Sequence, residues 1–343
     1  MIMSPHNDHY ALVIGINDYP GYSHLQGAID DAKAFCSWLH DDQGGALPEA
    51  NVRLILSNRE PPRPIHDEID DALVSIFKSL TPHKIYSRFY LFFSGHGLAS
   101  DTHGANLCLA KWSRLRRREA LDSSDYLNVI VDSGRFKEVV FFLDCCRIHL
   151  YKARGRPSAI EFPKPISPTT GTRTFIAFAT EHRNPAYEAA MGQSEFFSQN
   201  GPHIRGYFTR ALLAGLRGGA AQAPGGVTAS KLKAHLEAEI PRIAKEHGHR
   251  QLPEVRNGLP ANPESIFGHA YPQTHVKITF TNIRDGETTL EGPDLSIIRS
   301  GDASTGPWEC YLPKGLYVLR EKQTNELLPL RLSPEGGTID VEF

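Results

Sequence analysis

The sequence predicts an α/β fold, in which a mainly parallel sheet is sandwiched by helices, followed by a small all-β sandwich domain. In the first two-thirds of the chain, short apolar runs of strand length alternate with segments whose apolar residues recur at helical spacing. Continuous apolar runs are typical of strands buried on both faces, as in parallel sheets covered by helices. After about residue 271 the helical spacing stops, and short strand-like runs recur between Gly, Pro and Asp residues.

The strands of the first part are predicted from apolar runs of five to seven residues. They are Tyr10–Ile16, Val52–Leu56, Arg88–Phe93, Glu138–Leu143 and Thr174–Ala179. Amphipathic segments with one apolar face alternate with these runs. We expect helices at Ala28–His40, Ile65–Leu80, Tyr207–Leu216 and Ser230–Lys245.

The end of the chain predicts a small antiparallel β-sandwich at residues 271–343, after a first domain at residues 1–268. The expected strands are Val276–Asn282, Ser296–Arg299, Glu309–Leu312, Gly315–Glu321, Leu328–Leu332 and Thr338–Phe343. Within the first domain, residues 151–173 are rich in Pro, Lys and Arg. Such a composition predicts an exposed linker or loop.

Composition excludes several classes of protein. The chain has 343 residues, of which 40% are hydrophobic, so it can bury a sizeable core. Its net charge of -2 gives no general attraction to nucleic acid or an anionic membrane, and the basic segment Lys111–Arg118 is expected to be a solvated loop. No signal peptide or membrane span is evident, and five irregularly spaced cysteines predict a cytoplasmic protein with reduced thiols and no zinc site.

Two motifs that carry chemistry stand at the ends of two apolar strands. One strand runs into the sequence FFSGHG, which contains His96, and another runs into VFFLDCC, which ends at Cys146. Both motifs are expected at the same carboxyl edge of a parallel sheet. A thiol and an imidazole together there would form a nucleophile and its base. The backbone amides of Gly97 and Cys146 are candidate donors to an oxyanion.

Cys146 follows His96 by 50 residues, a separation typical of caspases. With the SGHG and Asp-Cys-Cys motifs, the opening strand ALVIGI, the sequence LQGAIDDA and the later GYFTRALL, residues 8–260 resemble the caspase and metacaspase clan of cysteine peptidases. The resemblance implies a large-subunit-like part at 1–150, a linker at 151–173 and a small-subunit-like part at 174–268. It also implies that Cys146, two residues after the strand-end Asp, is the nucleophile rather than Cys145.

The resemblance further implies an acidic substrate pocket formed by Asp31 and Asp144, which would favour cleavage after Arg or Lys. Two alternatives stay open. The aspartates could instead cap a helix and order a loop. A pocket specific for Asp would need arginines, for which Arg147 and Arg183 are available, and Arg147 stands where metacaspases usually have His.

Regulation and partners are expected from the same resemblance. Cleavage after basic residues would make the linker a self-cleavage region, with Arg154, Arg156 and Lys164 as candidate sites. The expected partner is a protein or peptide substrate, with a regulatory protein or small signal ligand upstream in a bacterial defence or cell-death system. The alternative from another functional class is a non-catalytic adaptor, which would keep the fold and bind partner proteins. No metal or cofactor is expected, because Asp122 and Asp125 are too scattered to match the calcium site of several metacaspases.

Overall fold

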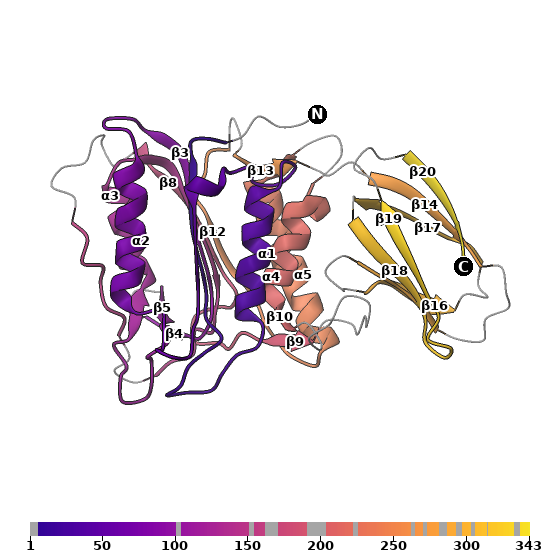
Figure 1. Ribbon diagram of the computed structural model, residues 1–343, viewed down its shortest axis with the longest axis horizontal. Helices are drawn as coiled ribbons and strands as arrows, with labels where there is room; N and C mark the ends of the chain where they lie inside the picture. Colours follow the sequence, from indigo (N-terminus) through magenta and orange to yellow (C-terminus); the bar gives the residue numbers. More distant parts are fainter. Residues whose placement is uncertain are drawn as a thin grey trace. The chain divides into compact units, whose positions relative to one another are not determined.

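The structure is a computed structural model. It describes residues 6–100, 104–150, 154–161, 171–190, 204–221, 226–261, 265–269, 273–280, 287–292, 297–302, 306–313, 315–332 and 337–343. The chain divides into two compact units (Figure 1). The first comprises Met1–Ala189 with Arg205–Ala270, and the second comprises Ala190–Ile204 with Tyr271–Phe343. The division into large- and small-subunit-like parts stays a prediction.

The first unit is built on a six-stranded sheet with the order β12-β8-β7-β3-β1-β2, in which β12 alone is antiparallel to its neighbour. The strands are β1 (His9–Gly15), β2 (Val52–Leu56), β3 (Tyr86–Ser94), β7 (Phe136–Asp144), β8 (Arg173–Phe178) and β12 (Glu254–Asn257). The register pairs Gly15 with Ser94 and Ser94 with Asp144. The carboxyl ends of β1, β3 and β7 therefore lie level at one edge of the sheet.

Helices cover both faces of this sheet (Figure 1). On one face lie α1 (Ala28–His40), α4 (Tyr207–Ala214) and α5 (Ala229–Glu246), and on the other lie α2 (His66–Ser79) and α3 (Ser123–Asp132). Successive residues of β1 alternate between the two cores: Leu12 packs with α2 and α3, whereas Val13 packs with α1 and α4. The expected strands and helices are thus present, with ends shifted by at most two residues.

Several short elements flank the central sheet. A three-stranded antiparallel sheet begins directly after His96 and consists of β4 (Gly97–Ala99), β5 (Ala105–Cys108) and β6 (Ala120–Asp122). The other short elements are η1 (Glu49–Asn51), β9 (Glu188–Ala190), β10 (Ile204–Gly206), a π-helical turn η3 (Gly215–Gly219), β11 (Gly226–Thr228) and β13 (Ile266–His269). None of these was expected from the sequence, because they are too short to show a periodic pattern.

The second unit contains a three-stranded sheet, β17-β14-β20, and a four-stranded sheet, β16-β15-β18-β19. Its strands are β14 (Gln273–Thr279), β15 (Glu287–Glu291), β16 (Ile297–Asp302), β17 (Trp308–Pro313), β18 (Gly315–Glu321), β19 (Leu327–Leu332) and β20 (Gly337–Glu342). Leu290, Trp308 and Leu319 share its core. The predicted sandwich differs in two respects: β15 was not expected, and β14 pairs with β20 in parallel.

The predicted exposed linker is exposed in most of its described side chains, but its backbone is partly held by hydrogen bonds. Residues 154–161, the docked segment, have exposed arginine side chains. Their backbone is hydrogen-bonded to other parts of the first unit. The amide of Arg156 donates to the carbonyl of Ala120 (2.6 Å), and its carbonyl accepts from the amide of Asp122 (3.0 Å). The carboxylate of Asp70 accepts hydrogen bonds from Ser158 Oγ and the Ala159 amide (3.0 and 3.1 Å). Lys164 lies outside the described residues.

The five cysteines are all free thiols, as the sequence predicts. In the part of the chain that the structure describes, no helix is long and apolar enough to span a membrane.

Candidate active site

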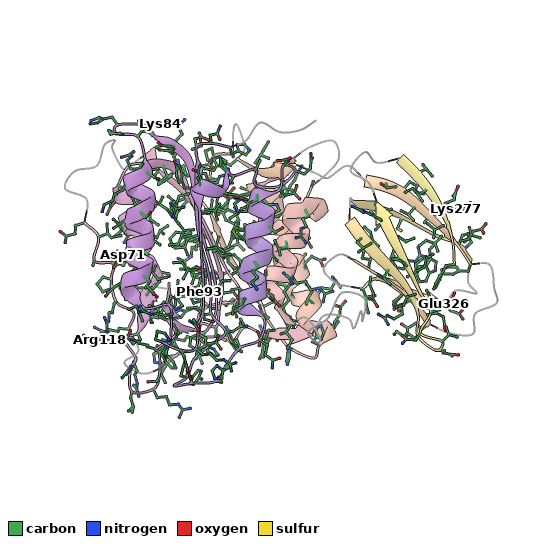
Figure 2. All side chains as sticks on the ribbon, viewed as in Figure 1. Asp71, Lys84, Phe93, Arg118, Lys277 and Glu326 are labelled. Carbon is green, nitrogen blue, oxygen red and sulfur yellow. The ribbon has the colours of Figure 1, made fainter. Side chains whose placement is uncertain are left out.

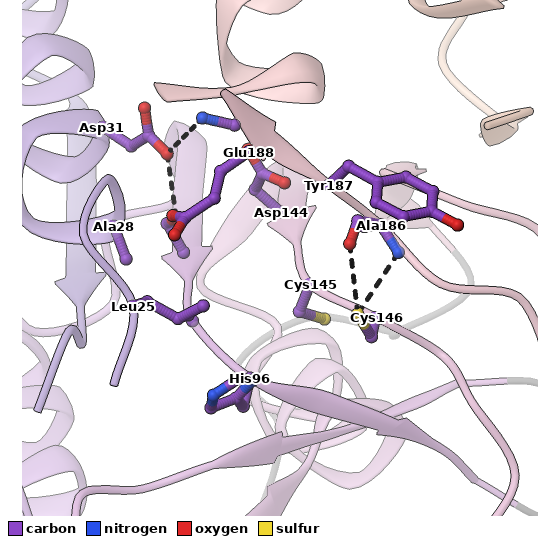
Figure 3. Close-up of a pocket in the computed structure, with 13 residues that line it drawn as sticks. Leu25, Ala28, Asp31, His96, Asp144, Cys145, Cys146, Ala186, Tyr187 and Glu188 are labelled. Carbon is purple, nitrogen blue, oxygen red and sulfur yellow. Dashed lines mark hydrogen bonds between the residues drawn. The ribbon is translucent and has the colours of Figure 1, made fainter. Parts of the chain in front are cut away.

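A pocket lies at the carboxyl edge of the central sheet (Figure 3). Because Ser94 and Asp144 are register partners at the ends of β3 and β7, the residues that follow them leave the sheet side by side. The pocket is lined by Leu25, Ala28, Asp31, Ser94, Gly95, His96, Asp144, Cys145, Cys146, Ala186, Tyr187, Glu188 and Gly206. The structure therefore brings His96, Cys146, Asp31 and Asp144 together, although they come from three separate parts of the sequence.

The imidazole of His96 is held by the loop between β1 and α1. Its Nε2 lies 2.8 Å from the carbonyl oxygen of Ser23. A carbonyl can only accept, so Nε2 carries the proton and the neutral ring keeps Nδ1 as its acceptor. The rings of Tyr19 and Tyr22 pack on the imidazole with centroid distances of 4.6 and 4.9 Å. Burial lowers the pKa of His96, against a smaller opposing effect of the Ser23 hydrogen bond.

The thiol of Cys146 is held by a different loop. Its Sγ accepts from the amide of Ala186 (3.2 Å) and donates to the carbonyl of the same residue (3.4 Å). Burial raises the pKa of Cys146, so the thiol form predominates at neutral pH. Among the described hydrogen bonds, none joins this thiol to His96 (Figure 3). The two groups thus share one pocket as a neutral thiol and a neutral imidazole.

Cys145 also borders the pocket but is embedded in the core, with 2% of its surface exposed. It packs against Gly97, where an added Cβ would lie 2.6 Å from Cys145 Sγ and 2.5 Å from the Cys146 carbonyl oxygen. Glycine at 97 is therefore required by this close approach. Gly97 itself does not line the pocket, and the contribution of its amide to an oxyanion site stays a prediction.

Three carboxylates line the pocket, and each is fixed by hydrogen bonds. Asp31, in the first turn of α1, accepts from Ser94 Oγ and from the amide of Gly206, both at 3.1 Å. Asp144 accepts from the amide and hydroxyl of Thr209 (3.0 and 2.6 Å). Glu188 was not expected from the sequence. It accepts from the amides of Gln26 and Gly27 (3.1 and 3.0 Å).

Asp31 and Asp144 are buried, and the pKa of each is raised. Burial and the neighbouring Asp144 hold the pKa of Asp31 well above its ordinary range, although the guanidinium of Arg205, 3.9 Å away, opposes this. Burial raises the pKa of Asp144 to about 6, and the charge of Glu188 adds to this while the hydrogen bonds from Thr209 oppose it. A cation entering the pocket would stabilise the ionised carboxylates of Asp31 and Asp144.

Residues 8–262 match the model of the caspase domain, a peptidase family. The chain belongs to the caspase domain family. The caspase-like family that the sequence motifs predict is thereby confirmed, and its α/β fold with a mainly parallel sheet is the predicted one.

Individual relatives share a third or fewer of their aligned residues with this chain. A probable protease from a Desulfuromonadales bacterium is 33% identical over 224 residues, which cover 61% of this chain and 26% of that protein. The chain thus spans about a quarter of the length of this relative. Caspase-1 from Spodoptera frugiperda is similar over 78% of this chain and 92% of its own, with 12% identity and a TM-score of 0.46. A pro-sf-caspase-1 structure is similar over 75% and 90%, with 14% identity and a TM-score of 0.43.

Within this caspase domain, Arg147 does not line the pocket. Its side chain is fully buried, pairs with Glu254 (2.5 Å) and lies over the ring of Phe178, 4.0 Å from the centroid. Arg183 is exposed and does not line the pocket either. The arginines considered for an Asp-specific pocket are therefore both outside it.

Other candidate residues of the caspase domain also lie elsewhere. Asp122 caps α3 by accepting from the amides of Ser124 and Asp125, and Asp125 accepts from the amide of Ser158. The side chains of His6, Asp8 and His9 are close enough to share a metal ion, but they lie at the amino end of β1, away from the pocket. That the chain needs no metal or cofactor stays a prediction.

Proposed function

We propose that this chain is a cysteine endopeptidase that uses Cys146 as nucleophile and His96 as base, and that it cleaves after Arg or Lys. The observation that carries the proposal is the composition of the pocket. Thiol, imidazole and three carboxylates line one cavity, and no Lys or Arg is among its described lining residues.

The reaction follows from the hydrogen bonds of the two groups. Cys146 Sγ attacks the carbonyl carbon of the scissile bond while its proton passes to Nδ1 of His96, since Nε2 is already protonated. The oxyanion would be stabilised by the amides of Gly97 and Cys146. His96 then protonates the departing amine as the C–N bond breaks, which leaves a thioester on Sγ. Water, deprotonated by His96, hydrolyses the thioester and restores the thiol.

The carboxylates explain the proposed preference for a basic residue. A guanidinium or ammonium group can form charge-assisted hydrogen bonds with Asp144 and Asp31, which are poorly solvated and only partly neutralised by Arg205, 3.9 Å from Asp31. Gly206 leaves room for it, because a Cβ there would overlap the carboxylate of Asp144. Glu188 adds a third negative charge at the pocket wall.

Self-processing is part of the proposal, but the three candidate sites differ. The Arg156 backbone is bonded to β6, and both Arg156 and Lys164 precede proline, so cleavage there would have to expel a ring nitrogen. Arg154 precedes glycine, whose amide donates to Asn106 Oδ1 (2.7 Å). We therefore favour cleavage after Arg154, following release of the docked segment. An upstream signal in a bacterial defence or cell-death system, acting in the cytoplasm, is proposed on the family resemblance alone.

A panel of fluorogenic peptides that differ only in Arg, Lys, Gln or Asp at the cleaved position tests the proposal. Wild type should cleave the Arg and Lys peptides, Cys146→Ala should cleave none, and Asp144→Asn should lose the basic preference. Asp71→Asn, on the exposed face of α2 (Figure 2), is the matched control and should behave as wild type. Cleavage of no peptide would refute the catalytic proposal, whereas preference for Asp would refute the proposed pocket.

A further inference from the structure

We propose that residues 111–118, the arginine loop, bind an acidic segment of the protein substrate next to the active site. The proposal deepens the proposed function, since it concerns a second substrate contact of the same enzyme. The loop has the sequence KWSRLRRR, and the sequence alone favours a solvated loop there.

The arginine loop is fixed beside the candidate base. Trp112 is buried, and its ring packs edge-on against Tyr22 with a centroid distance of 4.9 Å. The Tyr22 ring in turn packs edge-on against His96, also at 4.9 Å. Gly21 adds a second contact, because a Cβ on it would lie 2.7 Å from Ser113 Cβ. The loop is therefore anchored to the segment that holds the imidazole.

The loop presents positive charge to solvent. The side chains of Arg114, Arg116 and Arg118 are exposed, and no carboxylate among the described residues pairs with any of them. Two acids on segments that adjoin the loop are already neutralised. Asp18 pairs with Arg59 (2.5 Å), and Glu119 pairs with Arg156 (2.9 Å). The positive charge thus remains available to an external anion.

The kind of anion follows from the other side chains. Leu115, between two exposed arginines, has 97% of its surface exposed, and an apolar residue of a peptide could cover it. Nucleic acid would favour exposed rings for base stacking, but Trp112, the aromatic residue of the loop, is 2% exposed. A net charge of -2 also gives the chain no general attraction to a polyanion. These features favour a peptide with acidic residues around an apolar one.

The distance from the active site limits where those acidic residues can lie. Two ring contacts of 4.9 Å separate His96 from Trp112, and Arg114 follows Trp112 by two residues. At about 3.3 Å per residue, an extended substrate would place its acidic residues roughly three to seven positions from the scissile bond. Figure 2 shows Arg118 at the end of the first unit where β4 and β5 lie, and Lys84 at the opposite end.

The test compares three forms of the full chain on five peptides. The variants are wild type, Arg114→Gln/Arg116→Gln/Arg118→Gln, and the control Lys78→Gln/Lys84→Gln/Lys137→Gln, which removes three exposed charges near the amino edge of the sheet. The peptides are a tetrapeptide with Arg at the cleaved position and two extended versions with an Asp-Glu-Leu-Glu-Asp block on one side or the other. Two further peptides match the acid-extended ones but carry serine in place of each acidic residue.

Wild type should show a KM roughly tenfold lower for one acid-extended peptide than for its serine match, and added salt should reduce this difference. The arginine triple variant should lose the difference without a change on the tetrapeptide, whereas the lysine control should keep it. Equal KM values for acidic and serine peptides in wild type would overturn the proposal.

Failure of the proposed function is distinguishable from failure of this inference. If wild type cleaves no peptide, fluorescence anisotropy with the labelled acidic peptide still measures binding to the loop. Equal binding by wild type and the arginine triple variant would overturn the inference whatever the activity. Tighter loop-dependent binding of a single-stranded oligonucleotide than of the acidic peptide would overturn it in favour of a nucleic-acid site.

Discussion

The carbonyl oxygen of Ser23 lies 2.8 Å from Nε2 of His96 and thereby fixes which ring nitrogen can accept a proton. Ser23 belongs to the loop before α1, and the same loop supplies Tyr19, whose hydroxyl accepts from the His96 amide (2.9 Å). Ring and backbone of the candidate base are thus held from one segment. The thiol is held separately by Ala186, and no described hydrogen bond joins it to His96.

Replacement of each adjacent cysteine should have different effects. Cys146→Ala should abolish cleavage, because it removes the proposed nucleophile. Cys145→Ala should retain cleavage and lower the free energy of unfolding by about 1 kcal/mol, because Cys145 is a packed core residue. Peptide cleavage and urea denaturation measure the two effects. Retained cleavage in Cys146→Ala would reassign the nucleophile.

Alkylation of Cys146 should accelerate with pH across the alkaline range. Burial raises its pKa above the ordinary value near 9, and a lowered pKa keeps His96 neutral, so little thiolate exists at pH 7. The rate of iodoacetamide labelling, followed by mass spectrometry with Cys146→Ala as background, should rise steadily from pH 6 to pH 9. A plateau already reached at pH 7 would instead indicate a preformed thiolate and imidazolium pair.

Cleavage of Arg peptides should weaken as the pH falls through about 6. Burial raises the pKa of Asp144 to about 6, so acid neutralises the carboxylate that would bind the substrate cation. Thr209→Val removes a hydrogen bond that stabilises the ionised form, and it should move this acid limb to higher pH. The pH profile of kcat/KM measures the shift. Iodoacetamide labelling of Cys146 should stay unchanged, which controls for a general disturbance.

Gly206→Ala should close the basic-residue pocket. A Cβ there would overlap Asp144 and also approach its Cγ at 2.8 Å, and the backbone conformation at 206 suits alanine, so the effect would be steric. We expect the KM for Arg peptides to rise at least about tenfold, because the variant would lose roughly one charge-assisted hydrogen bond to the substrate. Gly171→Ala is the control, because nothing lies within 4 Å of its added Cβ. Equal KM values for the two variants would contradict the proposed pocket.

Glu254→Gln should destabilise the fold without changing specificity. It removes the carboxylate of Glu254 that pairs with the fully buried Arg147 guanidinium, which should lower the free energy of unfolding by about 3 kcal/mol. Glu246→Gln breaks an exposed pair with Arg242 and should cost at most about 1 kcal/mol. Urea denaturation compares the two variants. A changed preference at the cleaved residue in Glu254→Gln would mean that Arg147 influences the substrate pocket after all.

The sequence allowed the strand ends to be predicted because continuous apolar runs stop where a buried strand stops. That placement predicts that His96, Asp144 and Cys146 lie at one edge of the sheet, where the structure has them. Glu188 escaped prediction because its partners Gln26 and Gly27 lie more than 160 positions away in the chain, and no local motif marks such a contact.

Other differences also arise from long-range bonding. The docked segment has the composition of a free loop, yet Asp70, almost 90 positions earlier, binds its backbone. The strand at Glu287–Glu291 was missed because its sequence, ETTLE, has no apolar alternation, although four of its five residues are buried. Arg147 could be taken for a substrate-binding residue because burial of a charged side chain cannot be deduced from sequence alone.

The pairing of β7 with β8 has a consequence for any cut between them. These neighbouring strands are joined along six register partners, from Glu138 with Arg173 to Leu143 with Phe178, yet the chain between them contains every candidate self-cleavage site. Arg147 and Glu254 tie the same two sides together again. A nicked molecule would therefore elute from a sizing column as though intact, and the break would become visible only once a denaturant had separated the fragments.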